Sequence, residues 1–234
     1  MKNCYYALPE NYKKVYEINA KNKKTAILFT LASFVPFIIT VAIALLTKDL
    51  SDVATVTTKD LIITGVKFLS FSVLSIVYIV LHELTHGAAY KILTGAKLKF
   101  GISLSCAFCG VPEVYVNKKT ALIALASPLV LFGVLFAILS VVFWFFDPIC
   151  YLLSMAFLGL HLGGCVGDIY MLCMLCFKYN DKDLLLNDDG PSQRIYFPVC
   201  GEKNNSAKGA PDRDNSRADE EKTENAKIEE TPEK

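Results

Sequence analysis

Long apolar segments dominate the chain as far as Phe177, and charged or polar residues separate them. A transmembrane helix needs about 20 consecutive apolar residues to cross the hydrocarbon core of a bilayer. Four segments are long enough, and none of them contains more than three His, Asp, Glu, Lys or Arg residues. The pattern therefore predicts four transmembrane helices, over residues 25–46, 68–90, 120–146 and 149–177.

Two segments outside these helices have the alternating apolar and polar positions of β-strands. Residues 97–117 alternate on both sides of a Cys-Ala-Phe-Cys-Gly turn, which predicts a β-hairpin after the second helix. Residues 184–198 contain two shorter β-prone runs around an Asp-Gly-Pro turn. The sequence therefore predicts an all-α polytopic membrane protein with about four transmembrane helices and a small cytoplasmic β-hairpin.

The distribution of charge predicts how the helices cross the membrane. The 24 Lys and Arg residues nearly balance the 23 Asp and Glu residues, so the chain has no basic excess of the kind that binds nucleic acid. Residues 1–24 and 91–119 are rich in Lys, whereas residues 47–60 are slightly acidic. Because cytoplasmic loops carry the excess of Lys and Arg, both termini are expected in the cytoplasm of a multi-pass protein of the cell membrane.

The chain divides into three predicted parts. Residues 1–24 are a cytoplasmic N-terminal segment, and residues 25–200 form a membrane-embedded domain. The tail, residues 201–234, is rich in Lys, Glu, Asn and Ser and is expected to be disordered. The first apolar segment is too long for a cleaved signal peptide, as is the polar stretch before it, so a retained anchor is predicted.

The second apolar segment contains the motif His-Glu-Leu-Thr-His at residues 82–86. On a helix, His82 and His86 lie on one face about 5–6 Å apart, where both can reach one zinc ion at about 2.0–2.1 Å. Glu83 is then placed as general base for the water that the ion polarises. Ionisable side chains at membrane depth are costly and mark functional sites. The motif predicts His82 and His86 as zinc ligands and Glu83 as the catalytic residue.

A catalytic zinc site needs a third protein ligand and one open position. Asp168 is the only acidic residue inside the fourth apolar segment. His82 lies eight residues before the end of its segment, and Asp168 lies nine before the end of its own. At 1.5 Å per residue, both are roughly 12–14 Å from the same membrane boundary. We therefore predict Asp168 as the third ligand; the alternative is a neutral carboxyl that bonds to a neighbouring helix.

His161 precedes Asp168 by seven residues, which places it about 10 Å farther along a straight helix. Such a helix cannot bring both residues to one ion, so we predict His161 as a polar group near the substrate or behind the ligands. Nearby glycines could break the helix, but their GxxxG spacing favours close packing against another helix, for example near Gly87. These glycines are Gly159, Gly163, Gly164 and Gly167.

Eight cysteines include two CxxC pairs, Cys106/Cys109 and Cys173/Cys176. A four-thiolate zinc site across the two pairs is conceivable. The second pair, however, lies at an apolar helix end, where Cys behaves as a small hydrophobic residue. A cytoplasmic location also disfavours disulfides. The sequence therefore favours a packing role for both pairs.

Five stretches within roughly residues 65–198 carry a family resemblance: HELTHGAAYKILTG, CAFCGVPEVYV, LASPLVLFG, GDIYM and DDGPSQRIYFP. Together they resemble the putative zincin peptidases, bacterial membrane proteins that are distant relatives of the site-2 proteases. The resemblance implies a zinc-dependent intramembrane metalloprotease that cleaves transmembrane or membrane-associated proteins. It implies His82, His86 and Asp168 as Zn²⁺ ligands and Glu83 as catalytic base.

Two other functions could use the same residues. A catalytically inactive adaptor with a zinc site would bind other transmembrane helices through its glycine faces. A metal transporter would need a path lined by more His, Asp and Glu residues than the five in the predicted spans, and therefore ranks last. No feature of the sequence specifies an oligomeric state.

Overall fold

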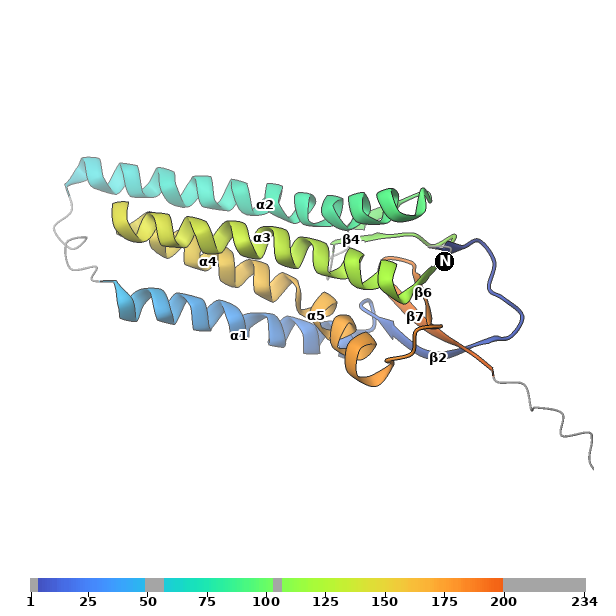
Figure 1. Ribbon diagram of the computed structural model, residues 1–234. Helices are drawn as coiled ribbons and strands as arrows, with labels where there is room; N and C mark the ends of the chain where they lie inside the picture. The colour runs from blue at the N-terminus through green and yellow to red at the C-terminus, as the bar shows by residue number, and fades with distance from the viewer. Residues whose placement is uncertain (1–3, 49–56, 103–106, 200–234) are drawn as a thin grey trace, which may run out of the picture. The chain divides into compact units, whose positions relative to one another are not determined.

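The computed structural model describes residues 4–48, 57–102 and 107–199, and most of them are helical (Figure 1). Three of the described helices are long and apolar enough to cross a membrane: α1 (Lys23–Thr47), α2 (Thr58–Thr94) and α3 (Lys118–Phe146). A further span would be a bent one. It consists of α4 (Pro148–Gly164), α5 (Val166–Cys173) and the π-helix η2 (Met174–Lys178), with a bend of 47° after α4. The four predicted segments thus correspond to three continuous candidate spans and one bent pair.

The apolar side chains of these helices face outward. Only 6% of the most apolar stretch of α1 and of α2 is buried within the protein, and 17% of that of α3. Leu31, Ile76 and Val130 are 62%, 68% and 60% exposed. Exposed apolar surface of this extent marks contact with another apolar phase. A lipid bilayer is therefore the environment that these helices fit, while their orientation in it stays a prediction.

The helices begin at polar residues that bond to free backbone N–H groups. The side chains of Asn22, Thr57, Asn117 and Asp147 each accept such a bond at the start of α1, α2, α3 and α4. These caps explain why each apolar segment becomes helical where it does. Helix α2 ends at Gly95, whose φ of 69° lies in the left-handed region that favours glycine.

One end of the helices carries a five-stranded antiparallel sheet in the order β1-β5-β6-β7-β2 (Figure 1). The prediction of an all-α fold was wrong in this respect, because the segment predicted only as a polar N-terminus supplies β1 and β2. The two β-prone runs in residues 184–198 are confirmed as β6 and β7. The five strands are β1 (Cys4–Tyr5), β2 (Tyr12–Asn19), β5 (Tyr115–Asn117), β6 (Leu185–Asp188) and β7 (Ser192–Pro198).

A hairpin follows the second helix as predicted, but its strands differ from the prediction. Residues 107–110 of the expected Cys-Ala-Phe-Cys-Gly turn form a strand, and residues 115–117 belong to the five-stranded sheet as β5. Strands β3 (Lys99–Ile102) and β4 (Ala107–Gly110) pair with each other as a separate two-stranded sheet. Gly87 of α2 lies against this hairpin, where an added Cβ would approach the Phe100 ring to 2.9 Å and the Cys109 sulfur to 3.1 Å. The hairpin therefore packs on the helix that carries the His-Glu-Leu-Thr-His motif, at a position with no side chain.

The glycine face of α4 packs against α1. A Cβ added at Gly159 would collide with the Thr40 hydroxyl, and one added at Gly163 would collide with the Ser33 carbonyl. The Ser33 hydroxyl donates a hydrogen bond of 2.8 Å to the Gly163 carbonyl. Close packing of these glycines is confirmed, but their partner is α1 and not the region around Gly87. The described part of the chain thus uses this glycine face internally.

Asp188, at the end of β6, connects the sheet to α2. Its carboxylate accepts hydrogen bonds from the Tyr90 hydroxyl at 2.8 Å, the Gly190 backbone N–H at 2.9 Å and the Gln193 amide at 3.2 Å. Its backbone carbonyl accepts one from the Val111 N–H at 2.8 Å. The side chain is buried, and burial raises the pKa of Asp188 to about 6 despite these donors.

We expect this raised pKa to make the stability of the protein depend on pH. The folded state holds the Asp188 proton more tightly than the unfolded state, in which an aspartate has a pKa of about 3.9. The stabilising contribution is therefore complete below about pH 4 and is lost as pH rises through about 6, a loss of about 3 kcal/mol. Thermal unfolding in detergent measures it as the Tm difference from the non-titrating variant Asp188→Asn. A difference that stays constant between pH 4 and pH 8 would contradict the assignment.

Candidate metal centre

The two histidines of the motif lie on the inner face of α2, as the helical spacing predicts. His82 is 7% exposed and His86 is 6% exposed, and their ring centroids are 5.0 Å apart. Burying the polar nitrogens of an imidazole costs free energy unless they have polar partners. Their partners therefore decide what the site can do.

Asp168 reaches these histidines from α5, directly after the bend that ends α4. Its Oδ2 lies 3.4 Å from the His82 Nε2 and 3.3 Å from the His86 Nε2. One ligand atom from each of the three residues lies within 4.8 Å of the others. The structure thus brings together the residues that the depth argument paired. Their role as ligands stays a prediction.

The lengths of these contacts suit ligands around a metal better than hydrogen bonds. In a tetrahedral zinc site with bonds of about 2.0–2.1 Å, neighbouring ligand atoms lie about 3.3–3.4 Å apart. A charge-assisted N–H···O hydrogen bond is about 2.7–2.9 Å long. The two nitrogen–oxygen distances at Asp168, 3.4 Å and 3.3 Å, agree with the first geometry.

The second ring nitrogen of His86 indicates which nitrogen is free for a metal. Its Nδ1 lies 2.8 Å from the Ala124 carbonyl of α3. Because a carbonyl only accepts, Nδ1 carries the proton, and Nε2 of the neutral ring directs a lone pair at Asp168. A lone pair facing a carboxylate is unfavourable unless a cation lies between them or the ring gains a second proton. Two imidazoles and a carboxylate also form a donor set that zinc takes in catalytic sites, so these residues fit a zinc ion.

Pro128 explains why the Ala124 carbonyl is available to His86. In an α-helix this carbonyl would accept the N–H of the residue four positions later, which here is a proline without an N–H. The Ser127 hydroxyl donates to the same carbonyl at 2.8 Å. The Ser-Pro pair, which in the sequence contributed only to the family resemblance, thus leaves a backbone acceptor of α3 open for a histidine.

We expect Pro128→Ala to weaken zinc binding about tenfold, at the lower end of the effect of removing a partner behind a metal ligand. The new N–H would compete with His86 for the Ala124 carbonyl. Competition with a chelating dye measures the affinity. Pro36→Ala is the matched control, because Pro36 lies inside α1 and does not line the cavity of the site. Equal affinities for the Pro128→Ala variant and the wild type would show that the freed carbonyl does not matter.

A cavity of about 320 Å³ opens at the three residues, and Glu83 lines it with them. Its volume falls within the range of about 300–1,000 Å³ that is typical of ligand pockets. Helix α1, the hairpin strand β4 and the turn between β6 and β7 supply further walls. Residues from these walls include Phe29, Ser33, Phe108, Cys109, Gly190 and Pro191.

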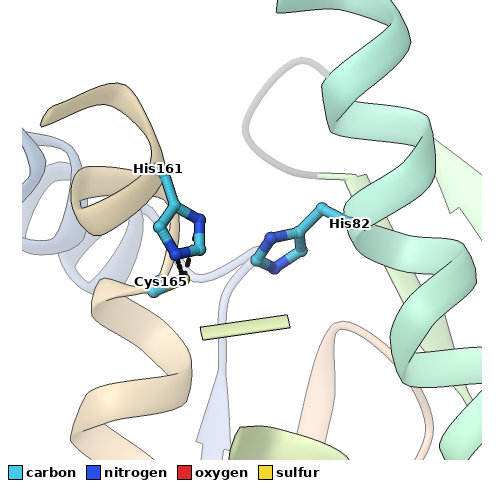
Figure 2. Close-up of side chains that lie close together, drawn as sticks. All are labelled: His82, His161 and Cys165. Atoms are coloured by element: carbon cyan, nitrogen blue, oxygen red, sulfur yellow. Dashed lines mark hydrogen bonds between the residues drawn. The ribbon is translucent and has the colours of Figure 1, made fainter. Parts of the chain in front are cut away.

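His161 does not join the His82, His86 and Asp168 group, although the helix that carries it is bent before Asp168 and not straight as assumed. It forms a second possible metal-binding group with His82 and Cys165, whose ligand atoms also lie within 4.8 Å of one another (Figure 2). The Cys165 sulfur lies 3.7 Å from the His161 Nδ1, and both residues are fully buried. Cys165 is not among the predicted site residues, although its position four residues after His161 is compatible with a shared helix face.

The predicted packing role of the cysteine pairs holds only in part. Cys109 is buried, whereas Cys173 and Cys176 are exposed. Cys106 lies outside the described residues, so a site across both pairs is not tested. Within the part of the chain that the structure describes, none of the other three belongs to a possible metal-binding group.

The protein thus combines helices of membrane length with a buried His/His/Asp group that could hold a metal ion. Residues 75–182 match the family model described as putative zincin peptidase. This match confirms the family resemblance over the region that contains the His-Glu-Leu-Thr-His motif, the hairpin, α3 and Asp168. No curated protein and no solved structure matches the chain.

Proposed function

We propose that this protein is a zinc-dependent intramembrane metalloprotease that hydrolyses peptide bonds of membrane-associated proteins. The observation that carries the proposal is the placement of His82 Nε2 and His86 Nε2 at 3.4 Å and 3.3 Å from one oxygen of Asp168. Glu83 lines the same cavity. The family match over residues 75–182 supports the same reading.

His82, His86 and Asp168 would hold the zinc ion. When bound, zinc supplies Lewis-acid chemistry, which polarises the scissile carbonyl and acidifies a water molecule. Glu83 would accept a proton from the water as the water oxygen attacks the carbonyl carbon. The same carboxyl group would then deliver that proton to the amine nitrogen as the C–N bond breaks. The burial of the site would limit the access of other nucleophiles.

The substrate must present an extended segment, because a helix encloses its peptide groups in its own hydrogen bonds. Strand β4 of the hairpin contributes Ala107, Phe108 and Cys109 to the cavity wall. We propose that an unwound substrate segment lies along β4 as an added strand, a common mode of peptide recognition. Cavity-lining residues of α1 and α2, among them Phe29 and Ile79, would face a substrate that arrives from the bilayer.

Metal analysis of detergent-purified protein tests the proposal directly. We expect one zinc per chain, removed by a chelator and restored by zinc alone. Substantially less than one zinc per chain under metal-replete conditions would overturn the enzyme proposal. The alternative of a helix-binding adaptor gains no support from the fold, because α1 already covers the glycine face at Gly159 and Gly163.

A further inference from the structure

A chain of hydrogen bonds runs behind His82, on the side of the ring that faces away from Asp168. The His82 Nδ1 lies 3.1 Å from the Tyr78 hydroxyl, and this hydroxyl lies 2.7 Å from the His161 Nδ1. The His161 Nε2 lies 3.1 Å from the Leu129 carbonyl of α3. Tyr78 is 6% exposed and His161 is fully buried, so water cannot easily replace these partners.

The donor and the acceptor of each of these hydrogen bonds follow from the Leu129 carbonyl, at which the series ends. The Leu129 carbonyl only accepts, so the His161 Nε2 carries the proton and its Nδ1 accepts from the Tyr78 hydroxyl. The Tyr78 oxygen then accepts from the Nδ1–H of His82. This assignment leaves the lone pair of the His82 Nε2 directed at Asp168, where a metal ligand needs it.

The two histidines of the motif thus depend on the same helix in different ways. His86 donates directly to a carbonyl of α3, that of Ala124, at 2.8 Å. His82 lies one helical turn earlier in α2 and reaches a second carbonyl of α3, that of Leu129, only through Tyr78 and His161. Partners of this kind fix the ring orientation and the tautomer of metal-binding histidines.

We propose that Tyr78 and His161 are positioning residues that hold His82 in the Nδ1–H tautomer and so prepare its Nε2 for zinc. The proposal rests on the proposed function, because it takes His82 as a ligand. It assigns His161 a partner role and not a place in the metal coordination. Both ring nitrogens of His161 already have hydrogen-bond partners, at 2.7 Å and 3.1 Å.

A metal at the second possible group, His82 with His161 and Cys165, would make His161 a ligand and not a positioning residue. A metal bound there through the Nδ1 of either histidine would displace the Tyr78 hydroxyl from that nitrogen. The Cys165 sulfur, which lies 3.7 Å from the His161 Nδ1, would then be a ligand. Removing Cys165 therefore separates the two arrangements.

Zinc affinity of the full-length protein in detergent tests the proposal, with a competing chelator as reporter. We expect Tyr78→Phe to lower the affinity about 10–100-fold, since it removes only the hydroxyl and keeps the ring. His161→Gln should have an effect of similar size. The double variant should bind zinc no more weakly than the single variants, because Tyr78 and His161 act through the same series of hydrogen bonds. Cys165→Ala is the matched control and should bind zinc as the wild type does.

Nitrogen-15 NMR of labelled histidines reports which ring nitrogen carries the proton, and so separates a positioning role from a purely structural one. The chain has only three histidines, so each can be assigned by substitution. We expect His161 to be neutral with its proton on Nε2, both with and without zinc. With zinc bound, His82 should carry its proton on Nδ1.

Two results would overturn the positioning role while leaving the proposed function intact. One is unchanged zinc affinity in Tyr78→Phe when Asp168→Ala has lost zinc. The other is a His161 proton on Nδ1. Loss of zinc in Cys165→Ala, with a thiolate-to-cobalt charge-transfer band in the cobalt-loaded wild type, would place the metal at the second group and overturn the proposal. Zinc binding that survives Asp168→Ala would contradict the proposed function itself.

Discussion

Replacing Glu83 by Gln should abolish peptide cleavage while one zinc ion per chain stays bound. The amide cannot take a proton from water, and loss of a general base costs about 10²–10⁴ in rate. The zinc should remain because Glu83 is not among the residues whose ligand atoms come together at Asp168. The measurement offers a library of single-span membrane peptides to the purified protein and identifies new chain ends by mass spectrometry.

The matched control for this variant is Thr85→Ala, inside the same motif. The Thr85 hydroxyl donates to the Leu81 carbonyl of its own helix at 2.8 Å and does not line the cavity. We expect this variant to produce the wild-type fragments at the wild-type rate. If Glu83→Gln also produces them, with zinc bound, Glu83 is not the base.

Asp168→Ala should lower zinc affinity by more than about a hundredfold, because even partners behind a ligand cost 10–100-fold when removed. The variant would leave two imidazoles facing an empty position, with one fewer ligand and no negative charge. Equilibrium dialysis with zinc measures the loss. Asp183→Ala removes a carboxylate of an exposed loop and should bind zinc normally. Equal binding by the wild type and Asp168→Ala would reject Asp168 as a ligand.

The sequence could predict the helices and the meeting of His82 with Asp168 because both depend on regular periodicity. Apolar length alone indicates where helices cross a bilayer, and residue counts along two helices indicate depth. No side-chain detail is needed for either inference. Residues far apart in the chain, one on α2 and one on α5, can therefore be paired from the sequence alone.

The residue pattern of β2 does not predict a strand, and so the five-stranded sheet is not predicted either. Between Lys14 and Tyr16 the register against β7 shifts, so the alternation of inward and outward residues is interrupted. The partner strand also lies near residue 198, at the other end of the described chain. Lys13 and Lys14 of this segment fit a cytoplasmic loop by their charge, and they also belong to a strand.

The partners of the histidines were beyond prediction for a different reason. Tyr78 lies four residues before His82 and therefore on the same face of α2, a relation that the sequence does contain. The place of His161 depends on how α4 packs against α3 and on where the helix bends. Neither the packing nor the bend follows from spacing, because the glycines allow several outcomes.

The pairing of β2 with β7 has a consequence for biosynthesis. Ile18 of β2 and Gln193 of β7 both line the cavity, and they are direct partners in the sheet. A ribosome releases β2 first and β7 only after every candidate membrane span has been made. The cavity is therefore completed only after β7 has been made, and a nascent chain that still lacks β7 carries an unfinished site into the membrane.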